Sequence, residues 1–168
     1  GNSYFKYFSL TNNERWHSFD NGPVHFIGLD SNPRNSLKLS QLLWLIRDLS
    51  KNNQPFTIVF FHHPLYSSGN HGSTLYLRFL WKPVFEHFNV DIVFNGHGHD
   101  YERGKVNNVN YIVTGGGGAP LKDVGRSWWT IYSEKTYHYC SVTANQSKLT
   151  FQAIKPDGSI IDSFMITK

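Results

Sequence analysis

Two short apolar segments of this chain each lead directly into histidines. The first covers residues 57–61, and the second covers residues 90–94 and is followed by an Asn-Gly-His-Gly-His loop. Short runs of β-branched and aromatic residues bounded by Pro or Gly are typical of strands buried on both faces, as in a parallel sheet. Ligands of open α/β sheets bind beyond the carboxyl ends of such strands. The sequence therefore predicts a functional site where the two segments end.

The histidines at these ends are candidate metal ligands. Neutral imidazole is the commonest metal ligand in proteins. Gly96 and Gly98 lack a Cβ, so their loop can turn sharply and present His97 and His99 to neighbouring points. Two metal ions about 3.5–4 Å apart need ligands that diverge in this way. A single histidine after a strand is usually structural, but histidines at two similar strand ends favour a metal site made by His62, His97 and His99.

Two longer motifs around these histidines resemble a known family. Residues 62–68 (HHPLYSS) and 90–103 (VDIVFNGHGHDYER) are similar to the C-terminal half of a calcineurin-like metallophosphoesterase. The Tyr-Glu-Arg triplet that ends the second motif, and residues 115–121 (GGGGAPL), resemble the purple acid phosphatase branch. The resemblance implies an α/β fold: the C-terminal half of an αββα sandwich, with a mixed sheet, flanking helices and a C-terminal antiparallel meander.

The carboxylate motifs that this family carries in its N-terminal half are missing from the sequence. No Asp is followed two residues later by His, and no Gly is followed by Asp. Gly1 and Asn2 match the start of a third motif, but Ser3 stands where its histidine is expected. We therefore expect residues 1–168 to be a partial metallophosphoesterase domain without its N-terminal metal-binding half. That half, as a separate chain, is an expected partner.

The resemblance also implies a function. It implies hydrolysis of phosphate esters, either small molecules or phosphoproteins, by a metal-activated hydroxide at a dinuclear site of iron with zinc, manganese or a second iron. His62 and His97 share one ion in this scheme, and His99 binds the other. His71 orients the phosphate or protonates the leaving group, and His63 contacts the substrate. An exposed loop histidine without a catalytic role is the alternative for His71. Family members also imply a secreted or extracytoplasmic location.

Charge and hydropathy restrict the partners. Sixteen basic and twelve acidic residues give a net charge of +4, which suits anionic substrates. The basic residues form no cluster of the kind that binds nucleic acid, so we expect no nucleic-acid partner. No apolar run reaches the ~20 residues that span a bilayer, so we expect no membrane partner. Two other functions stay open: a non-catalytic phosphate-binding or interaction fragment, and a protein that binds a single zinc ion.

Further elements follow from local patterns. An Asn-Gly turn predicts a hairpin of residues 16–20 and 24–30. Ser40 is the expected N-cap of a helix with a stripe of leucines, and residues 74–88 form a second helix. Residues 109–114 form a strand. The segments 137–144, 148–154 and 159–166 are separated by turn residues and predict a meander, which we expect to extend the sheet.

Overall fold

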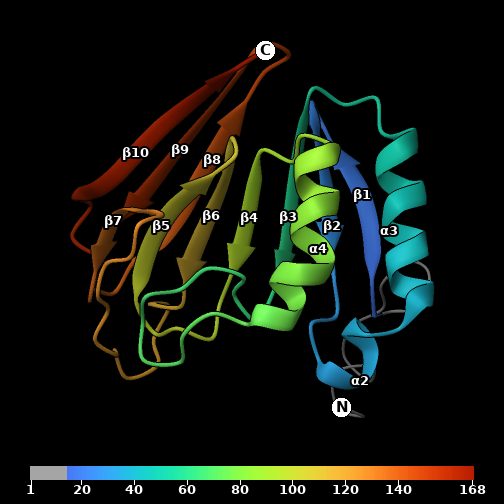
Figure 1. Cartoon of the computed structure of the whole chain (residues 1–168). Coiled ribbons are helices and arrows are strands. Elements are labelled where there is room, and N and C mark those ends of the chain that lie inside the picture. The colour runs from blue at the N-terminus through green and yellow to red at the C-terminus, as the bar shows by residue number, and fades with distance from the viewer. Residues whose placement is uncertain (1–14) are drawn as a thin grey trace, which may run out of the picture.

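The computed structural model describes residues 15–168, which form two β-sheets and flanking helices (Figure 1). Gly1, Asn2 and Ser3, the expected remnant of a motif, lie outside the described residues. The seven-stranded sheet has the order β1-β2-β3-β4-β6-β5-β7, and the three-stranded sheet has the order β10-β9-β8. The strands are β1 (His17–Asn21), β2 (Val24–Gly28), β3 (Phe56–Phe61), β4 (Ile92–Asn95), β5 (Tyr101–Val106), β6 (Val109–Thr114), β7 (Thr130–Glu134), β8 (Tyr139–Ala144), β9 (Lys148–Ile154) and β10 (Ile160–Thr167). The helices are α2 (Pro33–Ser36), α3 (Leu39–Lys51) and α4 (Leu75–His87).

The large sheet is mixed, as predicted. Strands β2, β3, β4 and β6 are parallel to one another. The outer strands β1, β5 and β7 each run antiparallel to their neighbours. The α/β class, the flanking helices and the C-terminal meander are confirmed. No helix within residues 15–168 is long and apolar enough to cross a membrane.

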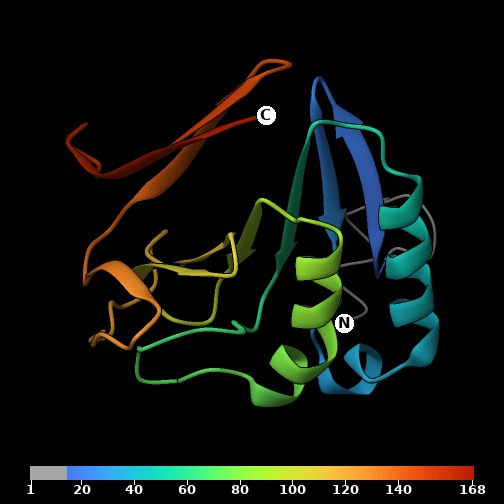
Figure 2. The same ribbon diagram turned by 45° about the horizontal axis from the view of Figure 1, so that its top comes forward.

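The two faces of the large sheet have different covers (Figure 2). Helices α3 and α4 pack on one face, where Leu45, Trp81 and Phe85 are buried against side chains of the sheet. The three-stranded sheet covers part of the other face and forms a second core. Each cover buries one face of strands β3 and β4, which explains why their sequences are continuously apolar.

The expected start of the first long helix was wrong. Lys38 is the N-cap of α3 and makes no side-chain capping bond, so Ser40 lies inside the first turn. The reason is the short helix α2, which ends at Ser36 and leaves only its C-cap Leu37 and the N-cap Lys38 before α3 begins. The buried Gln41 fixes this junction, because its side chain bonds both the backbone N–H and the carbonyl of Asp30, at 2.8 and 3.1 Å.

The meander also differs from expectation, because it forms a sheet of its own instead of extending the first. Alternate residues of β9 (Leu149, Phe151 and Ala153) are completely buried. They pack against side chains such as Ile58 and Ile112 on the face of the large sheet. A strand with one apolar face needs another apolar surface to cover that face. Stacking the meander on the large sheet covers the apolar face of β9, whereas hydrogen bonding at the edge of the large sheet would not.

A buried ion pair joins the two sheets. Arg103 of β5 donates two hydrogen bonds to Asp162 of β10, at 2.6 and 2.9 Å. The hydroxyl of Tyr101 donates a third bond to the same carboxylate at 2.7 Å. Only 11% of the Arg103 side chain and 7% of the Asp162 side chain are exposed. Each charge therefore depends on the other for compensation.

We expect Asp162→Ala to lower the free energy of unfolding by about 3–5 kcal/mol, because it leaves a buried guanidinium without its partner. Urea denaturation followed by circular dichroism measures the change. The control is Asp123→Ala, which removes an ion pair with Lys135 from a site where the carboxylate is 81% exposed. That variant should differ from the wild type by less than about 1 kcal/mol. Equal effects of the two variants would contradict a special role for Asp162.

His25 forms a second charged cluster, far from the strand ends. Its Nδ1 lies 2.6 Å from Asp20 Oδ1 and its Nε2 lies 2.9 Å from Asp48 Oδ2. Ser18 donates a bond to Asp48, and Gln54 donates one to Asp20. Burial alone lowers the pKa of His25, but the hydrogen bonds and charges of Asp48 and Asp20 outweigh burial, so that the pKa is raised above 6.5. The hydrogen bonds to His25 and Gln54 lower the pKa of Asp20.

The stability of the domain should therefore depend on pH through His25. A raised pKa in the folded state stabilises the fold fully below pH 6.5, and this contribution is lost as the pH rises through the raised pKa. At the acid end, the contribution of Asp20 is present above its unfolded pKa of 3.8 and is lost as the pH falls through the lowered value. Denaturation of the wild type and of His25→Gln across this range should show a difference that shrinks above pH 6.5. If the difference in the free energy of unfolding between the two proteins stayed constant with pH, His25 would not be the source of the pH dependence.

Candidate metal centre

The parallel pairing of β3 and β4 brings the candidate ligands together. Phe61 pairs with Asn95 at the ends of the two strands. The next residue of each strand continues the contact, because the N–H of Gly96 donates to the carbonyl of His62 at 3.0 Å. His97 then has a φ of 63°, which bends the loop back toward β3. A Cβ at Gly96 would lie 3.3 Å from His62 Nδ1, so glycine leaves room for this ring.

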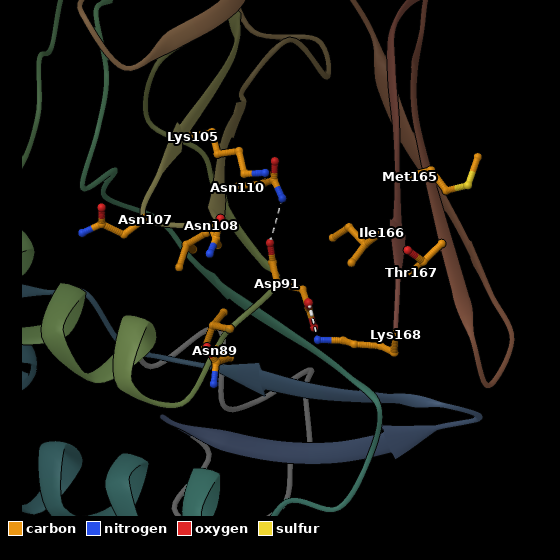
Figure 3. Close-up of a pocket in the computed structure, with 12 residues that line it drawn as sticks. Asn89, Asp91, Lys105, Asn107, Asn108, Asn110, Met165, Ile166, Thr167 and Lys168 are labelled. Carbon is orange, nitrogen blue, oxygen red and sulfur yellow. Dashed lines mark hydrogen bonds and ion pairs between the residues drawn. The ribbon is translucent and has the colours of Figure 1, made fainter.

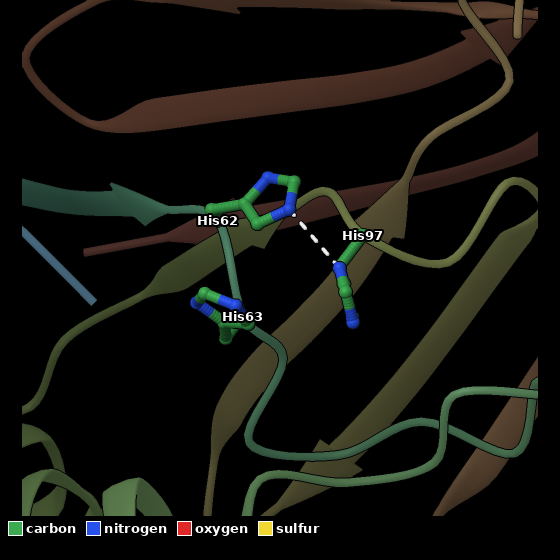
Figure 4. A group of neighbouring side chains, drawn as sticks. All are labelled: His62, His63 and His97. Carbon is green, nitrogen blue, oxygen red and sulfur yellow. Dashed lines mark hydrogen bonds between the residues drawn. The ribbon is translucent and has the colours of Figure 1, made fainter. Parts of the chain in front are cut away.

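Three imidazoles form a close group at this edge (Figure 4). His62, His63 and His97 each offer a nitrogen atom, and these atoms all lie within 4.8 Å of one another. The closest pair is His62 Nε2 and His97 Nδ1, which are 3.1 Å apart. The structure thus brings together two of the histidines predicted as metal ligands. It adds His63, which the sequence indicated only as a substrate contact.

His99 lies outside this close group. Its Nδ1 is 3.0 Å from the carbonyl oxygen of Pro120. A carbonyl only accepts, so Nδ1 carries the hydrogen of this bond and Nε2 keeps a free lone pair. Metal-binding histidines commonly use one nitrogen in this way to fix the ring while the other faces the ion.

His71, the predicted proton donor, also approaches the group. Its ring centroid lies 4.5 Å from that of His97 and 6.5 Å from that of His99. The side chain is exposed, on the loop that follows β3. A group here can reach a ligand held over His97.

The local environment keeps the three close rings neutral. Burial, followed by the charges of neighbouring histidines, lowers the pKa of His62 and of His97. Burial, followed by the charge of His97, lowers the pKa of His63. Ser31 orients His63, because its hydroxyl lies 2.9 Å from Nδ1 and accepts the backbone N–H of the same residue at 3.1 Å. Sequence reasoning missed Ser31, although it follows the end of β2 at the same edge of the sheet.

This donor set fits a metal ion. Two nitrogens bound to one tetrahedral zinc at 2.0–2.1 Å lie about 3.3 Å apart, so the observed 3.1 Å between His62 and His97 needs only a small separation of the two rings to admit an ion. Neutral imidazole suits zinc, copper, iron and nickel. The close group in residues 15–168 contains no carboxylate, so it offers one ion a set of nitrogen ligands and offers no bridge to a second.

Comparison with known proteins identifies the family. Residues 2–101 match the family described as calcineurin-like phosphoesterase, and residues 109–163 match the one described as iron/zinc purple acid phosphatase-like protein C. The chain belongs to the calcineurin-like phosphoesterase family. The predicted resemblance, including the purple acid phosphatase branch, is confirmed.

Plant enzymes are among its relatives. The chain is 37% identical over 116 residues to a purple acid phosphatase of Glycine max, covering 64% of this chain and 25% of the relative. It is 33% identical over 116 residues to the Fe(3+)-Zn(2+) purple acid phosphatase 12 of Arabidopsis thaliana, covering 64% and 24%. The chain thus spans about a quarter of the length of these curated relatives.

Solved structures agree with this membership. Purple acid phosphatase PPD1 from yellow lupin seeds superposes with a TM-score of 0.80 at 25% identity, over 96% of this chain and 34% of that one. Plasmodium GAP50 superposes with a TM-score of 0.76 at 20% identity, over 90% and 53% of the two chains, and shows a shared fold. Both agree with the arrangement of a mixed sheet stacked on a smaller antiparallel sheet.

Glu102 fixes the loop that carries His71 in this member of the calcineurin-like phosphoesterase family. The side chain is only 1% exposed. Its carboxylate accepts bonds from the N–H and hydroxyl of Ser68, at 2.6 and 2.8 Å, and from the side chains of Trp129 and Thr130, at 3.1 and 2.6 Å. No local pattern predicts this role of Glu102, because its donors lie 27 to 34 residues away.

Asp100 is a second buried carboxylate beside the site. It is fully buried, and within residues 15–168 neither oxygen has a hydrogen-bond partner. Burial, followed by the charge of Glu102, raises the pKa of Asp100 to about 6. A Cβ at Gly69 or Gly98 would lie 2.6 or 2.9 Å from its Oδ2, so a larger residue at either position would displace this carboxylate.

A cavity of about 500 Å³ lies at the opposite edge of the sheet, where β4 begins (Figure 3). Four asparagines line it, and the Nζ of Lys168 bonds Asp91 at 2.7 Å within it. None of the histidines at the carboxyl edge lines this cavity. The groups suited to metal chemistry therefore lie at the carboxyl edge and not in this cavity.

Glu102→Gln should loosen the loop of residues 67–72. An amide keeps one acceptor and turns a donor toward Ser68 or Thr130, so charge-assisted bonds worth about 1.5–3 kcal/mol are weakened. We expect a comparable fall in the free energy of unfolding and faster hydrogen exchange at the amides of residues 68–72. The matched control is Glu86→Gln, which alters an i,i+4 pair with Lys82 on α4. Unchanged hydrogen exchange at residues 68–72 would show that the Glu102 carboxylate does not hold this loop in place.

Proposed function

We propose that this chain supplies the histidine ligands of a metal centre that hydrolyses phosphate esters. The observation that carries the proposal is the 3.1 Å approach of His62 Nε2 and His97 Nδ1 at the carboxyl edge of β3 and β4. Membership of the calcineurin-like phosphoesterase family supports it, as does the similarity to purple acid phosphatases. Small phosphate esters and phosphoproteins are the proposed substrates, and the proposed location is extracytoplasmic.

The proposed ligand assignment follows the family scheme. His62 and His97 hold one ion, and His99 holds a second through the nitrogen that Pro120 leaves free. The proposed ions are iron with zinc, manganese or a second iron. When bound, they lower the pKa of a coordinated water and stabilise negative charge on the phosphate.

Two further histidines act on the substrate in this proposal. His71 is exposed and its ring is 4.5 Å from His97, so it can donate a hydrogen bond to the phosphate or a proton to the leaving oxygen. His63 is held by Ser31 and turns its other nitrogen, Nε2, to the substrate. Burial, followed by the charge of His97, lowers the pKa of His63, which favours the neutral form of that ring.

The missing carboxylates limit what these residues do alone. Ions of charge +2 or +3 at a dinuclear site need anionic oxygen donors as well as imidazoles. We propose that residues outside this sequence complete the domain and supply them. The 168-residue chain alone then binds metal weakly and hydrolyses little or no phosphate ester.

A single-ion site is the second candidate, and the position of His63 favours it. Because His62, His63 and His97 all lie within 4.8 Å, three imidazoles can share one ion with an open fourth position. Both candidates use His62 and His97, and they differ in the third histidine that matters. A single-ion site depends on His63, whereas the dinuclear scheme depends on His99.

Metal content and zinc affinity test the proposal. We expect His97→Ala to abolish the weak metal binding of the 168-residue chain, because it removes the closest partner of His62. His87→Ala is the matched control, since this histidine is exposed at the end of α4. Elemental analysis and calorimetric zinc titration measure binding, and p-nitrophenyl phosphate tests turnover from about pH 4 to 9. Unchanged metal binding in His97→Ala would refute the centre, and full phosphatase activity of the 168-residue chain would refute the proposal that it is incomplete.

The same titration separates the two candidates. Loss of the bound ion in His63→Ala, with no effect of His99→Ala, indicates a single-ion site. The reverse result, with more than one ion bound per chain, indicates the dinuclear scheme.

A further inference from the structure

A second cavity lies at the same edge of the fold as the histidines. It has a volume of about 440 Å³ and is lined by residues 116–118, Tyr137, His138, Tyr139 and Pro156. The glycines follow the end of β6, which is parallel to β4, so they emerge at the same edge as His97. The cavity therefore lies at the same edge of the sheet as the proposed metal centre.

The segment that lines this cavity also holds His99. The N–H of Gly115 donates to the carbonyl of Asp100 at 3.1 Å, and Pro120 accepts the Nδ1–H of His99 at 3.0 Å. The N–H of Lys122 donates to the carbonyl of His99 at 2.9 Å. Gly118 is two residues before Pro120, so their Cα atoms are at most about 8 Å apart. One continuous segment thus contacts both His99 and the cavity.

The walls of the cavity are uncharged and flat. Gly117 and Gly118 present bare backbone, with nothing within 4 Å of a Cβ built on either. Tyr137 and Tyr139 are 43% and 55% exposed, so part of each aromatic side chain is open to a ligand. No residue lining the cavity is acidic or is a lysine or arginine.

His138 contributes no charge to these walls. It is 5% exposed, and its two ring nitrogens lie 3.0 Å from the carbonyl of Thr136 and 3.0 Å from the hydroxyl of Thr114. Burial lowers the pKa of His138, which favours the neutral form of the ring. A phosphate group finds no cation in this cavity, whereas an aromatic ring can stack on tyrosine and glycine surfaces.

We propose that this cavity binds the planar aromatic part of a phosphate ester, such as the base of a nucleotide or an aryl leaving group. The proposal rests on the proposed function for the position of the phosphate. It adds a preference for aromatic over aliphatic esters, because only a flat ring gains stacking contacts with Tyr137 and Tyr139. The histidine centre takes the anionic end of such a molecule, and this subsite takes the neutral end.

Ring binding is testable on the 168-residue chain without metal or phosphate. Adenosine and p-nitrophenol are titrated separately into ¹⁵N-labelled protein, and amide shifts are followed by NMR. Saturable shifts are expected at residues 116–118, 137 and 139. Tyr137→Ala with Tyr139→Ala should weaken binding about tenfold or more, as expected for loss of aromatic stacking. Both tyrosines are partly exposed, and thermal unfolding checks that the double variant folds.

Two controls make the outcome specific. Tyr137→Phe with Tyr139→Phe should retain binding, because the rings remain. Phe79→Ala removes an aromatic ring that is 81% exposed on α4 and should change nothing. The proposal is overturned if neither probe shifts the glycine amides, if the double alanine variant binds as the wild type does, or if cyclohexanol binds equally well. These outcomes are independent of the zinc titration of His97→Ala, so failure of ring binding and failure of the metal centre can be told apart.

Discussion

The parallel pairing of β3 with β4 is the constraint on which the site depends. Its register places Phe61 opposite Asn95, and the bond from Gly96 to the carbonyl of His62 extends the pairing by one residue. A slip of one residue would turn every side chain of one strand to the opposite face. Both faces of these strands are buried, one by helices and one by the second sheet, so such a slip is costly. The approach of His62 to His97 is thus fixed by the core and not by the loops alone.

Strand β5 connects this edge to the rest of the molecule. Alternate residues of a strand point to opposite faces, so Tyr101 and Arg103 reach Asp162 of the second sheet while Glu102 reaches the loop of His71. Asp100, immediately before the strand, packs against Gly69 and Gly98 of the two loops that carry His71 and His97. The position of the second sheet and the position of the site loops therefore depend on one polar strand.

The sequence predicted those elements whose signals are local. The apolar runs before His62 and His97, the helix α4 and the three strands of the meander were all found, because periodicity and turn residues mark them. Strands β5 and β7 were not predicted, since the buried charges of β5 are compensated by residues up to 59 positions away. The same holds at the site: the meeting of His62 and His97 was predicted, whereas Ser31, which orients His63 from 32 residues away, was not.

The carboxyl edge of the sheet offers two different chemical environments on either side of the segment 115–122. On one side lie neutral imidazoles with free lone pairs, which suit a cation and, through it, an anion. On the other lie tyrosine rings and bare glycine backbone, with no lysine, arginine or acidic side chain. A phosphate ester has one anionic and one neutral end, so such a division favours a single orientation of the substrate. This segment makes two hydrogen bonds with His99. The carbonyl of Pro120 accepts one from the imidazole ring, and the N–H of Lys122 donates one to the backbone carbonyl of His99. A movement of this segment would change the position of His99 and the shape of the cavity together, so the two proposals, of a metal ligand and of a ring-binding subsite, depend on the same backbone.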